Sequence, residues 1–471
     1  MSRRYKELAK NTILITIGNF SSKILGLLLI PLYTSYLSTA EYGFYDLAYT
    51  TIQLLFPILT LGVTESIMYF LLRKKMGEKD VLSINVIFIL IASTIFSLLL
   101  LLNHILKIFP EIDSYAPLVA LFYLVFCLNN CLVQFAKGVD EVKHMTVAGV
   151  LGTAATLLAN ILALVVFNMG LRGYFIANIF GFLVPVLYLF IALKCWRYLR
   201  LKNRAENYKR IVLFALPLVV NTLSWWVNNA ADRYIVAFFR GTDANGLLSV
   251  AYKIPSALAV VGGIFIQAWQ ISAIKEYSKN AREFYARLFF VFNGALVIIS
   301  GFLIIFSEPM ARVMFANDFY NAWQLVPFLL LSSLFNQNAG FLGAILTAGG
   351  RLFGISMSAV VGVIFNIVLN IIFTICFGPI GITVATMISS FIIYAMRKHY
   401  AKGDFLPEKY TRIVLSWILL IVMAVVVIAL NNYYITVPIY LALVVIYKDI
   451  FSYILDFLKR KKMSIMKGKH E

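Results

Sequence analysis

The chain has 471 residues, of which 61% are hydrophobic and 13% are charged. A water-soluble domain is nearer half apolar and about a quarter charged, so this composition excludes a soluble enzyme and indicates a membrane protein. The 41 Lys and Arg residues outnumber the 22 Asp and Glu residues, for a formal net charge of +19. That balance points to nucleic acid, a membrane surface or an anionic substrate as a partner.

The apolar runs predict about 14 membrane-spanning helices, because a hydrocarbon core about 30 Å thick needs roughly 20 apolar residues per helix. Strands of a membrane barrel would be about ten residues long with strict alternation, and these runs have neither property. The fold class predicted is therefore an all-α polytopic membrane protein. The predicted spans lie at residues 11–36, 43–72, 81–103, 115–136, 145–168, 173–195, 211–239, 246–273, 284–306, 322–346, 353–377, 380–396, 412–430 and 435–456.

The basic residues set the expected orientation in the membrane. With a cytoplasmic N-terminus, 33 of the 41 Lys and Arg residues fall in cytoplasmic segments, and only Lys107, Arg172, Arg240 and Arg312 fall in external loops. This asymmetry follows the positive-inside rule, so both termini are predicted to be cytoplasmic. Since most cations serve topology and no soluble module with interleaved aromatic residues exists, no nucleic acid is expected as a partner.

The chain contains an internal repeat. Residues 37–50 align with residues 240–253 at an offset of 203, and the aligned glycines are Gly43 and Gly246. Further identities are Thr39/Thr242, Ala48/Ala251 and Tyr49/Tyr252, and a later pattern at Gly170, Gly173 and Ala177 recurs at Gly378, Gly381 and Ala385.

Six spans in each half predict two parallel six-helix repeat bundles around a central cleft, and substrate sites in such transporters lie between the halves. The expected domains are residues 1–200, residues 201–400, and residues 401–471 with two additional helices and a basic cytoplasmic tail.

Polar side chains at helical spacing follow spans 1, 2, 7 and 8. On the second span they are Asp46, Thr50, Gln53, Pro57, Thr60 and Thr64. Amides of this kind suit the hydroxyl groups of a sugar, and an indole ring suits a sugar face. The uncharged candidates for substrate binding are Asn19, Gln53, Asn221, Trp225, Asn228 and Gln267, with Trp226 as the alternative to Trp225. The alternative for any one of them is helix packing, in which a hydrogen bond contributes about 1 kcal/mol or less.

Charged side chains inside spans are expensive, since a lipid-facing charge costs about 2.5–3.5 kcal/mol. They include Lys23, Asp46, Glu65, Asp232, Arg233, Lys253 and Lys448. Lys23 lies near the centre of the first span and is the leading candidate for binding an anionic substrate, together with Arg233 and Lys253.

The acidic residues Asp46, Glu65 and Asp232 are candidates for coupling the movement of protons or sodium ions. Two alternatives stay open: a structural ion pair among Asp46, Asp232, Arg233 and Lys253, and a counter-ion role for Glu65 beside Lys23. Prolines inside spans 1, 2, 7 and 8 predict helix kinks, which either bend during transport or are static.

No catalytic constellation is present. A search for phosphate loops, G-x-S-x-G and H-E-x-x-H finds none, and no loop between spans is long enough for a folded catalytic domain. The four cysteines and four histidines do not form a metal-binding pattern. We therefore expect no enzyme activity, no cofactor and no metal.

Several residues near the N-terminus resemble the start of polysaccharide-transporter flippases of the Wzx type. They are Asn11, Thr12, the run at 31–34, Leu37, Ser38 and the Glu41-Tyr42-Gly43 run. These flippases belong to the multidrug/oligosaccharidyl-lipid/polysaccharide exporter superfamily, and the span number and two six-helix halves are similar over the whole chain.

The resemblance implies a bacterial inner-membrane flippase that moves undecaprenyl-pyrophosphate-linked oligosaccharide repeat units to the outer leaflet by alternating access. A polysaccharide polymerase and glycosyltransferases are then expected as partners. Relatives that transport lipid II have several arginines in their first spans, whereas the first span here has only Lys23, so that relative ranks lower.

Three other functions remain open. A cation-coupled drug antiporter of the same superfamily would depend on buried acids and would need no central cation. A membrane-embedded glycan polymerase or ligase would need a large external loop with catalytic Arg or His residues, and the longest external loop, 307–321, offers only Glu308, Arg312 and Asp318. A purely structural scaffold would not require charges inside spans.

Overall fold

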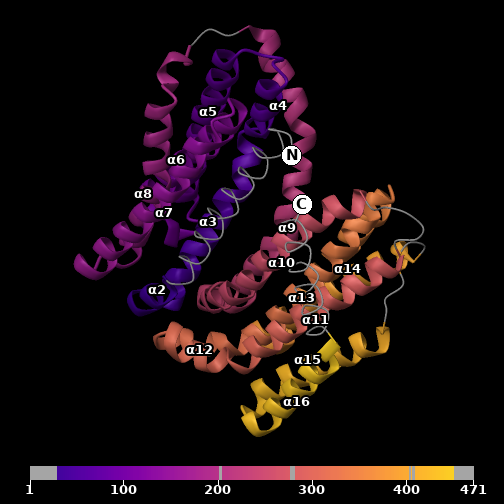
Figure 1. The fold of residues 1–471 in the computed structure, drawn as a ribbon. Coiled ribbons are helices and arrows are strands. Elements are labelled where there is room, and N and C mark those ends of the chain that lie inside the picture. The colour runs from indigo at the N-terminus through magenta and orange to yellow at the C-terminus, as the bar shows by residue number, and fades with distance from the viewer. Residues whose placement is uncertain (1–28, 201–203, 276–281, 403–404, 406–408, 450–471) are drawn as a thin grey trace, which may run out of the picture. The chain divides into compact units, whose positions relative to one another are not determined.

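The computed structural model describes residues 29–200, 204–275, 282–402, 405 and 409–449, and the regular elements in these ranges are helices without any strand. The predicted all-α fold is confirmed for this part of the chain (Figure 1). The helices are α2 (Ile30–Tyr36), α3 (Thr39–Leu59), α4 (Ile67–Leu72), α5 (Glu78–Leu106), α6 (Ala116–Gly138), α7 (Val142–Asn160), α8 (Gly170–Ala192), α9 (Ala205–Ala251), α10 (Lys253–Lys275), α11 (Arg282–Ile305), α12 (Ser307–Met314), α13 (Val326–Ala348), α14 (Leu352–Ala401), α15 (Tyr410–Leu430) and α16 (Tyr433–Ile446).

Within the described residues, nine helices are long and apolar enough to cross a membrane, or ten if one bent pair is a single span. The predicted number of 14 is therefore not confirmed. The first predicted span falls mostly at residues 1–28, outside the description, and the 14-residue helix α16 is short for a span. Two pairs of predicted spans also run together, at α14 and across α9 and α10.

The merged helices still break where the sequence predicts separate spans. The backbone of α9 is non-helical at Gly241, with φ of 84°, and that of α14 is non-helical at Gly378, with φ of 65°. Positive φ values favour glycine because it has no Cβ. Gly170, which the repeat aligns with Gly378, also has a positive φ of 53°. These equivalent positions of the two halves thus both have a positive φ.

The chain folds into two compact units. One contains Met1–Ala237 and Gly241–Gly246, and the other contains Phe238–Arg240 and Leu247–Glu471. The polypeptide therefore passes between the units three times, after Ala237, Arg240 and Gly246. The predicted domain limits at residues 200 and 400 stay a prediction.

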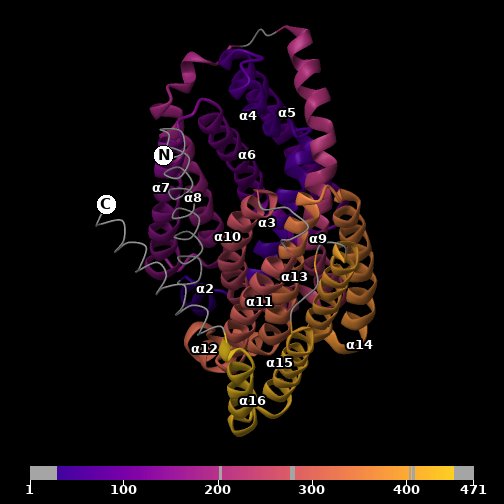
Figure 2. The same cartoon turned by 45° about the vertical axis from the view of Figure 1, so that its right-hand side comes forward.

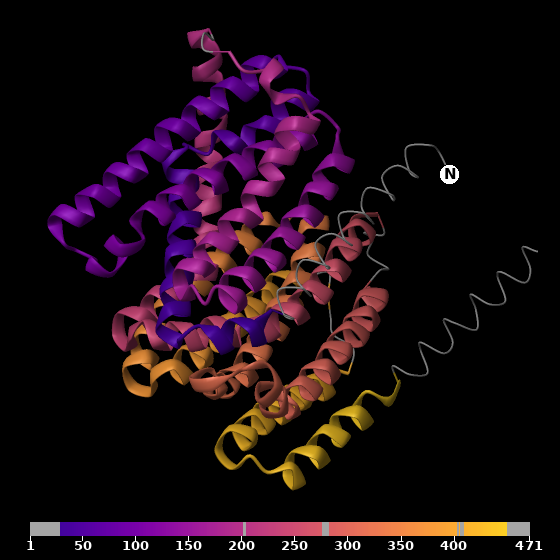
Figure 3. The same ribbon diagram turned by 90° about the vertical axis from the view of Figure 1, so that its left-hand side faces the viewer.

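The first unit has an aromatic core between α3, α6 and α8. The rings of Tyr45 and Tyr174 lie 4.3 Å apart, and Tyr45 also contacts Phe122 and Phe175 at 6.1 and 5.0 Å. Each of these four side chains is buried. Helices α5 to α8 run side by side in this unit, as the indigo and magenta ribbons of Figure 3 show. The aromatic core fixes the face that α3 presents to its other neighbour, α9.

The second unit is organised around α13, most of whose residues are buried. Trp269 of α10 stacks on Phe341 of α13 at 4.6 Å, and its indole nitrogen donates a hydrogen bond to the Phe341 carbonyl. Helices α15 and α16 form an antiparallel pair (Figure 2), and both pack against α11. The two additional C-terminal helices therefore belong to the core of this unit.

The second predicted span is not one continuous helix. Helix α3 contains Pro57 and ends at Leu59, and the segment Val63–Leu72 continues at an angle of 65°. Proline removes a backbone donor and strains the preceding turn, so a helix readily ends near it. The expected polar stripe is thus divided: it follows α3 through Pro57, whereas Thr64 lies beyond the bend in a short 3₁₀ turn.

Candidate functional site

Helix α3 begins with a capping box. The Ser38 hydroxyl accepts a hydrogen bond from the Glu41 amide, and the Glu41 carboxylate accepts one from the Ser38 amide. This arrangement fixes the first residue of the helix and therefore its rotation. Asp46 and Thr50 then lie one turn apart, on the side of α3 that faces α9.

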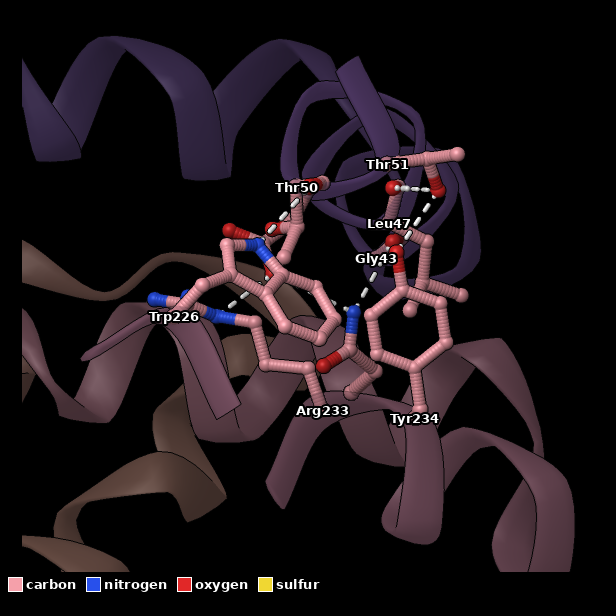
Figure 4. Close-up of polar contacts among 9 residues, drawn as sticks. Gly43, Leu47, Thr50, Thr51, Trp226, Arg233 and Tyr234 are labelled. Atoms are coloured by element: carbon pink, nitrogen blue, oxygen red, sulfur yellow. Dashed lines mark hydrogen bonds and ion pairs between the residues drawn. The ribbon is translucent and has the colours of Figure 1, made fainter. Parts of the chain in front are cut away.

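An ion pair joins the two helices. Arg233 Nε of α9 lies 2.9 Å from Asp46 Oδ2 of α3, and the two side chains are 24% and 15% exposed (Figure 4). Asn245 Nδ2 donates to the Gly43 carbonyl at 2.9 Å and to Asp46 Oδ2 at 3.4 Å. The Asp46 carboxylate is thus held by one charged group, through an ion pair, and by one neutral hydrogen-bond donor. Because the pair is partly exposed, it remains accessible to a proton or an ion.

Hydroxyl and indole groups surround this ion pair (Figure 4). Trp226 Nε1 of α9 donates to the Thr50 carbonyl at 3.1 Å. The Tyr234 hydroxyl lies 2.7 Å from Thr51 Oγ1, which also donates to the Leu47 carbonyl. The Trp226 and Tyr234 rings are 5.5 Å apart. Two aromatic rings and two hydroxyls therefore lie beside the charges, a combination that suits a carbohydrate.

A further bond ties the start of α3 to the segment after Gly241. Thr39 Oγ1 donates to Asp243 Oδ1 at 2.7 Å. Thr39 is buried, and Asp243 lies between the break at Gly241 and Asn245. Asn245 and Asp243 together position this short segment against the first two turns of α3. In the described residues, no group of three or more His, Cys, Asp or Glu side chains has the arrangement of a metal site.

The structure brings two predicted site residues together, Asp46 and Arg233, as the open alternative of an ion pair anticipated. Asp232 is buried on α9 beside Arg233 and has interactions of its own. Gln53 is half-buried on α3, two turns after Asp46. Glu65 is exposed and lies in the 3₁₀ turn after the bend, not on α3.

The other predicted residues lie in the second unit or outside the description. Lys253 and Gln267 lie on α10 in the second unit, where Lys253 is half-buried and Gln267 is exposed. Lys23 and Asn19 lie outside the described residues. The backbones of Asn221, Trp225 and Asn228 belong to α9, but their side chains lie outside the description.

The sequence did not single out Asn245 or Tyr234 as members of the cluster, and it gave Trp226 only as an alternative to Trp225 for stacking on a sugar. Asn245 had a usable signal, because it precedes Gly246 in the repeat, and a Thr-x-x-x-Gly pattern marks close helix approach in membranes. Tyr234 had no comparable signal, because its partner is a hydroxyl on α3 and no spacing along α9 reveals it. The bond from Trp226 to the Thr50 carbonyl could not be foreseen for the same reason.

The fold is that of a multi-pass, all-α membrane protein. Residues 8–270, more than half of the chain, match the family model described as "Polysaccharide biosynthesis protein", and the chain belongs to this family. The predicted resemblance to polysaccharide transporters is confirmed at the level of the family.

Solved structures of transporters share the fold. "Lipid II flippase MurJ, inward closed conformation" is 19% identical, with a TM-score of 0.69 over 94% of this chain and 99% of that chain. An inward-facing multidrug resistance MATE family transporter of the MOP superfamily is 16% identical, with a TM-score of 0.57 over 85% of this chain and 95% of that chain. The similarity to both proteins concerns the fold alone.

A curated relative carries a functional name. The "Probable low-salt glycan biosynthesis flippase Agl15" of Haloferax volcanii is 22% identical over 225 residues. The aligned region covers 46% of this chain and 46% of the relative, so the chain spans about half the length of the relative it matches.

Proposed function

We propose that the protein is a flippase that moves undecaprenyl-pyrophosphate-linked oligosaccharide repeat units from the cytoplasmic to the outer leaflet, for surface polysaccharide biosynthesis. Membership of the polysaccharide biosynthesis family carries this proposal. The glycan flippase among the relatives and the shared fold of a lipid II flippase support it. The transport step is alternating access between the two six-helix halves, without an enzymatic reaction.

The Asp46–Arg233 pair supplies chemistry for this function. An Arg guanidinium binds phosphate oxygens through two parallel hydrogen bonds, and here it is occupied by a carboxylate instead. Protonation of Asp46 would remove that attraction and release Arg233 to the substrate pyrophosphate. In this proposal the pair has two states. Asp46 binds the coupling ion in the state in which Arg233 is released, and Arg233 then binds the substrate.

The other proposed residues complete the site. Lys23 and Lys253 add positive charge for the pyrophosphate, and Asn19, Gln53, Asn221, Asn228 and Gln267 hydrogen-bond sugar hydroxyls. Trp225 stacks on a sugar face, as Trp226 does from the described cluster. Asp232 and Glu65 are further proposed carriers of the coupling ion, for which the membrane potential supplies about 2.3 kcal/mol per charge per 100 mV.

The cellular setting follows from the same proposal. The protein is placed in the bacterial inner membrane with both termini in the cytoplasm, in agreement with the distribution of basic residues. Glycosyltransferases build the substrate on the cytoplasmic side, and a polymerase consumes it on the outer side.

Mass spectrometry of lipid-linked intermediates in a depletion strain tests the function. Depletion should cause complete repeat units on the lipid carrier to accumulate while surface glycan falls, and the wild-type gene should reverse both effects. Arg233→Gln should fail to reverse them, whereas Lys79→Gln, at an exposed position of α5, should succeed. Unchanged intermediates together with normal surface glycan would overturn the proposal.

A cation-coupled antiporter for drugs or other small molecules is the second candidate, favoured by the fold shared with MATE transporters and by the accessible Asp46 carboxylate. It predicts that the depletion strain becomes sensitive to cationic dyes while its lipid-linked intermediates stay at wild-type levels. The same two measurements on one strain therefore separate the two functions.

A further inference from the structure

A half-buried arginine in the second unit is held by neutral groups. Arg397, near the end of α14, donates from Nε to Ser358 Oγ at 3.1 Å and from Nη1 to the Ala339 carbonyl at 2.9 Å. Ser358 is on the first part of α14 and Ala339 is on α13, so three helical segments converge on one guanidinium. Among the residues that the structure describes, no Asp or Glu forms an ion pair with Arg397.

This environment differs from that of the other shielded cations. Arg233 pairs with Asp46, and Lys409 pairs with Asp449 at 2.7 Å. A cation removed from water is costly unless an opposite charge accompanies it. A guanidinium has five N–H donors, of which the Ser358 and Ala339 contacts use two. The Nη2 group therefore remains available for an anion.

The surrounding backbone leaves space for this guanidinium. A Cβ at Gly343 of α13 would lie 3.0 Å from Arg397 Nη1. Glycine at this position therefore lets the side chain lie flat against α13. Two hydrogen bonds and one glycine together hold the guanidinium in a single orientation, and a pre-oriented donor pays less side-chain entropy when it binds a ligand.

The site lies near the ends of α13 and α14 that the turn 349–351 joins. Gly343 lies five residues before the end of α13 and Ser358 lies six residues after the start of α14, which places the guanidinium roughly 8 Å from these helix ends. The turn between the helices, 349–351, is predicted to be cytoplasmic. Arg351 and Lys398 add positive charge at the same end: Arg351 donates to the Tyr400 carbonyl, and Lys398 lies over the Tyr410 ring.

We propose that Arg397 anchors a phosphate-binding site at this end of the second unit, and that the site takes the phosphate group of an anionic membrane lipid. Basic pockets between transmembrane helices on the cytoplasmic side bind lipid headgroups in this way. A phospholipid phosphate and a polyprenyl pyrophosphate present the same oxygens to a guanidinium. The site does not depend on the proposed transport function, since phospholipids surround any membrane protein.

Lipid binding to the full-length protein tests the site. The protein is purified in dodecyl maltoside, which contains no phosphate, and titrated separately with phosphatidylglycerol and with undecaprenyl pyrophosphate while retained lipid is measured by native mass spectrometry. Arg397→Gln should weaken the binding of at least one lipid by about ten- to hundredfold. Arg397→Lys should retain part of the affinity, because it keeps the charge and loses the planar fork.

Two further variants separate charge from position. Gly343→Ala keeps the arginine at position 397 but displaces its guanidinium. This variant should weaken the binding of the same lipid. Arg73→Gln removes an exposed arginine of the first unit and should bind both lipids as the wild type does. A loss confined to phosphatidylglycerol assigns the site to the bilayer, and a loss confined to undecaprenyl pyrophosphate assigns it to the lipid carrier.

A purely structural role for Arg397 gives a different result. Each lipid would then bind Arg397→Gln with wild-type affinity. Alternatively, the loss of thermal stability of Arg397→Gln relative to the wild type would be equal with and without lipid. Either result overturns the proposed site. Neither result affects the depletion test of the flippase function, because that experiment does not involve Arg397.

Discussion

Gly43 and Gly246 make reciprocal contacts. A Cβ on Gly43 would lie 2.0 Å from the Thr242 carbonyl oxygen, and a Cβ on Gly246 would lie 2.0 Å from the Thr39 carbonyl oxygen. These two glycines and two threonines are the residues that the internal repeat aligns at an offset of 203. The two copies of one Thr-x-x-x-Gly pattern therefore pack on each other inside the first unit. Small residues at this spacing allow helix backbones to approach closely in a membrane.

Substitution of either glycine should separate these segments. Gly43→Ala and Gly246→Ala each place a methyl group against a backbone oxygen that cannot move independently. We expect a loss of about 1–3 kcal/mol of stability for each, the usual cost of overpacking. Thermal unfolding of the purified protein in detergent measures it. Gly149→Ala is the control, because nothing lies within 4 Å of a Cβ at that position of α7. Equal unfolding temperatures for all three variants would contradict the contact.

The Asp46–Arg233 pair predicts a non-additive pattern of variants. Asp46→Asn or Arg233→Gln leaves one charge without its partner and should cost about 1–3 kcal/mol, below the value for a fully buried pair because both side chains are partly exposed. The double variant should be more stable than the sum of the single effects predicts. A double-mutant cycle of thermal stability measures this coupling. A coupling energy near zero would show that the pair contributes no net interaction.

Glu308 predicts an acid-sensitive contact in the second unit. Burial raises the pKa of its carboxyl, but hydrogen bonds from Tyr320, Arg312 and Tyr433 outweigh burial and hold the pKa below the ordinary value of 4.5. A carboxyl whose pKa is lower in the folded state stabilises the protein above its unfolded pKa, and this stabilisation is lost as pH falls through the folded pKa. Because Tyr433 begins α16, acid should loosen the attachment of that helix to α12.

Thermal unfolding from about pH 6 towards pH 3 measures the effect of Glu308. The wild type should lose stability more steeply below about pH 4.5 than Glu308→Gln, which is already weakened at neutral pH and has no carboxyl to titrate. Asp318→Asn, at an exposed position, should follow the wild-type curve. If Glu308→Gln also follows the wild-type curve of stability against pH, the hydrogen bonds to Glu308 do not depend on its charge.

Asn293 predicts how the last two helices attach. Its amide donates to the Tyr447 hydroxyl at 2.7 Å and accepts from Asn338 at 2.7 Å and Trp417 at 3.0 Å, and all four residues are buried. Asn293→Leu keeps the approximate volume but leaves these polar groups without a partner. We expect a loss of about 2 kcal/mol or more and faster proteolysis around α15 and α16.

The matched control for Asn293 is Asn178→Leu. Asn178 donates to the Tyr174 carbonyl of its own helix, so its loss should have a smaller effect. Limited proteolysis and thermal unfolding of both variants provide the comparison. Similar results for the two would mean that Asn293 does not connect the helices energetically.

The sequence predicted the helical elements well because the membrane imposes a simple local rule. Each backbone polar group in a bilayer must bond within its own segment, so long apolar runs become helices whatever their neighbours are. The breaks at Gly241 and Gly378 follow from local composition for the same reason. The bend after Pro57 was harder to place, since a proline either kinks or ends a helix according to the packing around it.

The candidate site was predicted in part. The polar spacing along α3 identified Asp46, and the cost of a charge inside a span identified Arg233. Asn245 was missed because it bonds to the Gly43 carbonyl. Trp226 was named only as an alternative to Trp225, and its bond to the Thr50 carbonyl was not foreseen. Every residue has a backbone carbonyl, so the sequence carries no sign of which one a distant side chain will meet.

Arg397 shows the same division between sequence and structure. Its place in a basic cluster after a span predicted a residue that serves topology, because orientation depends only on how many cations lie on each side. Only the fold reveals that its guanidinium lies between α13 and α14 with Ser358 and Ala339 as neutral partners. The sequence by itself determined the class of protein, its helices and its repeat, since these depend on local hydropathy. Tertiary structure decided which charges are paired, because pairing depends on distances between residues that are far apart in the chain.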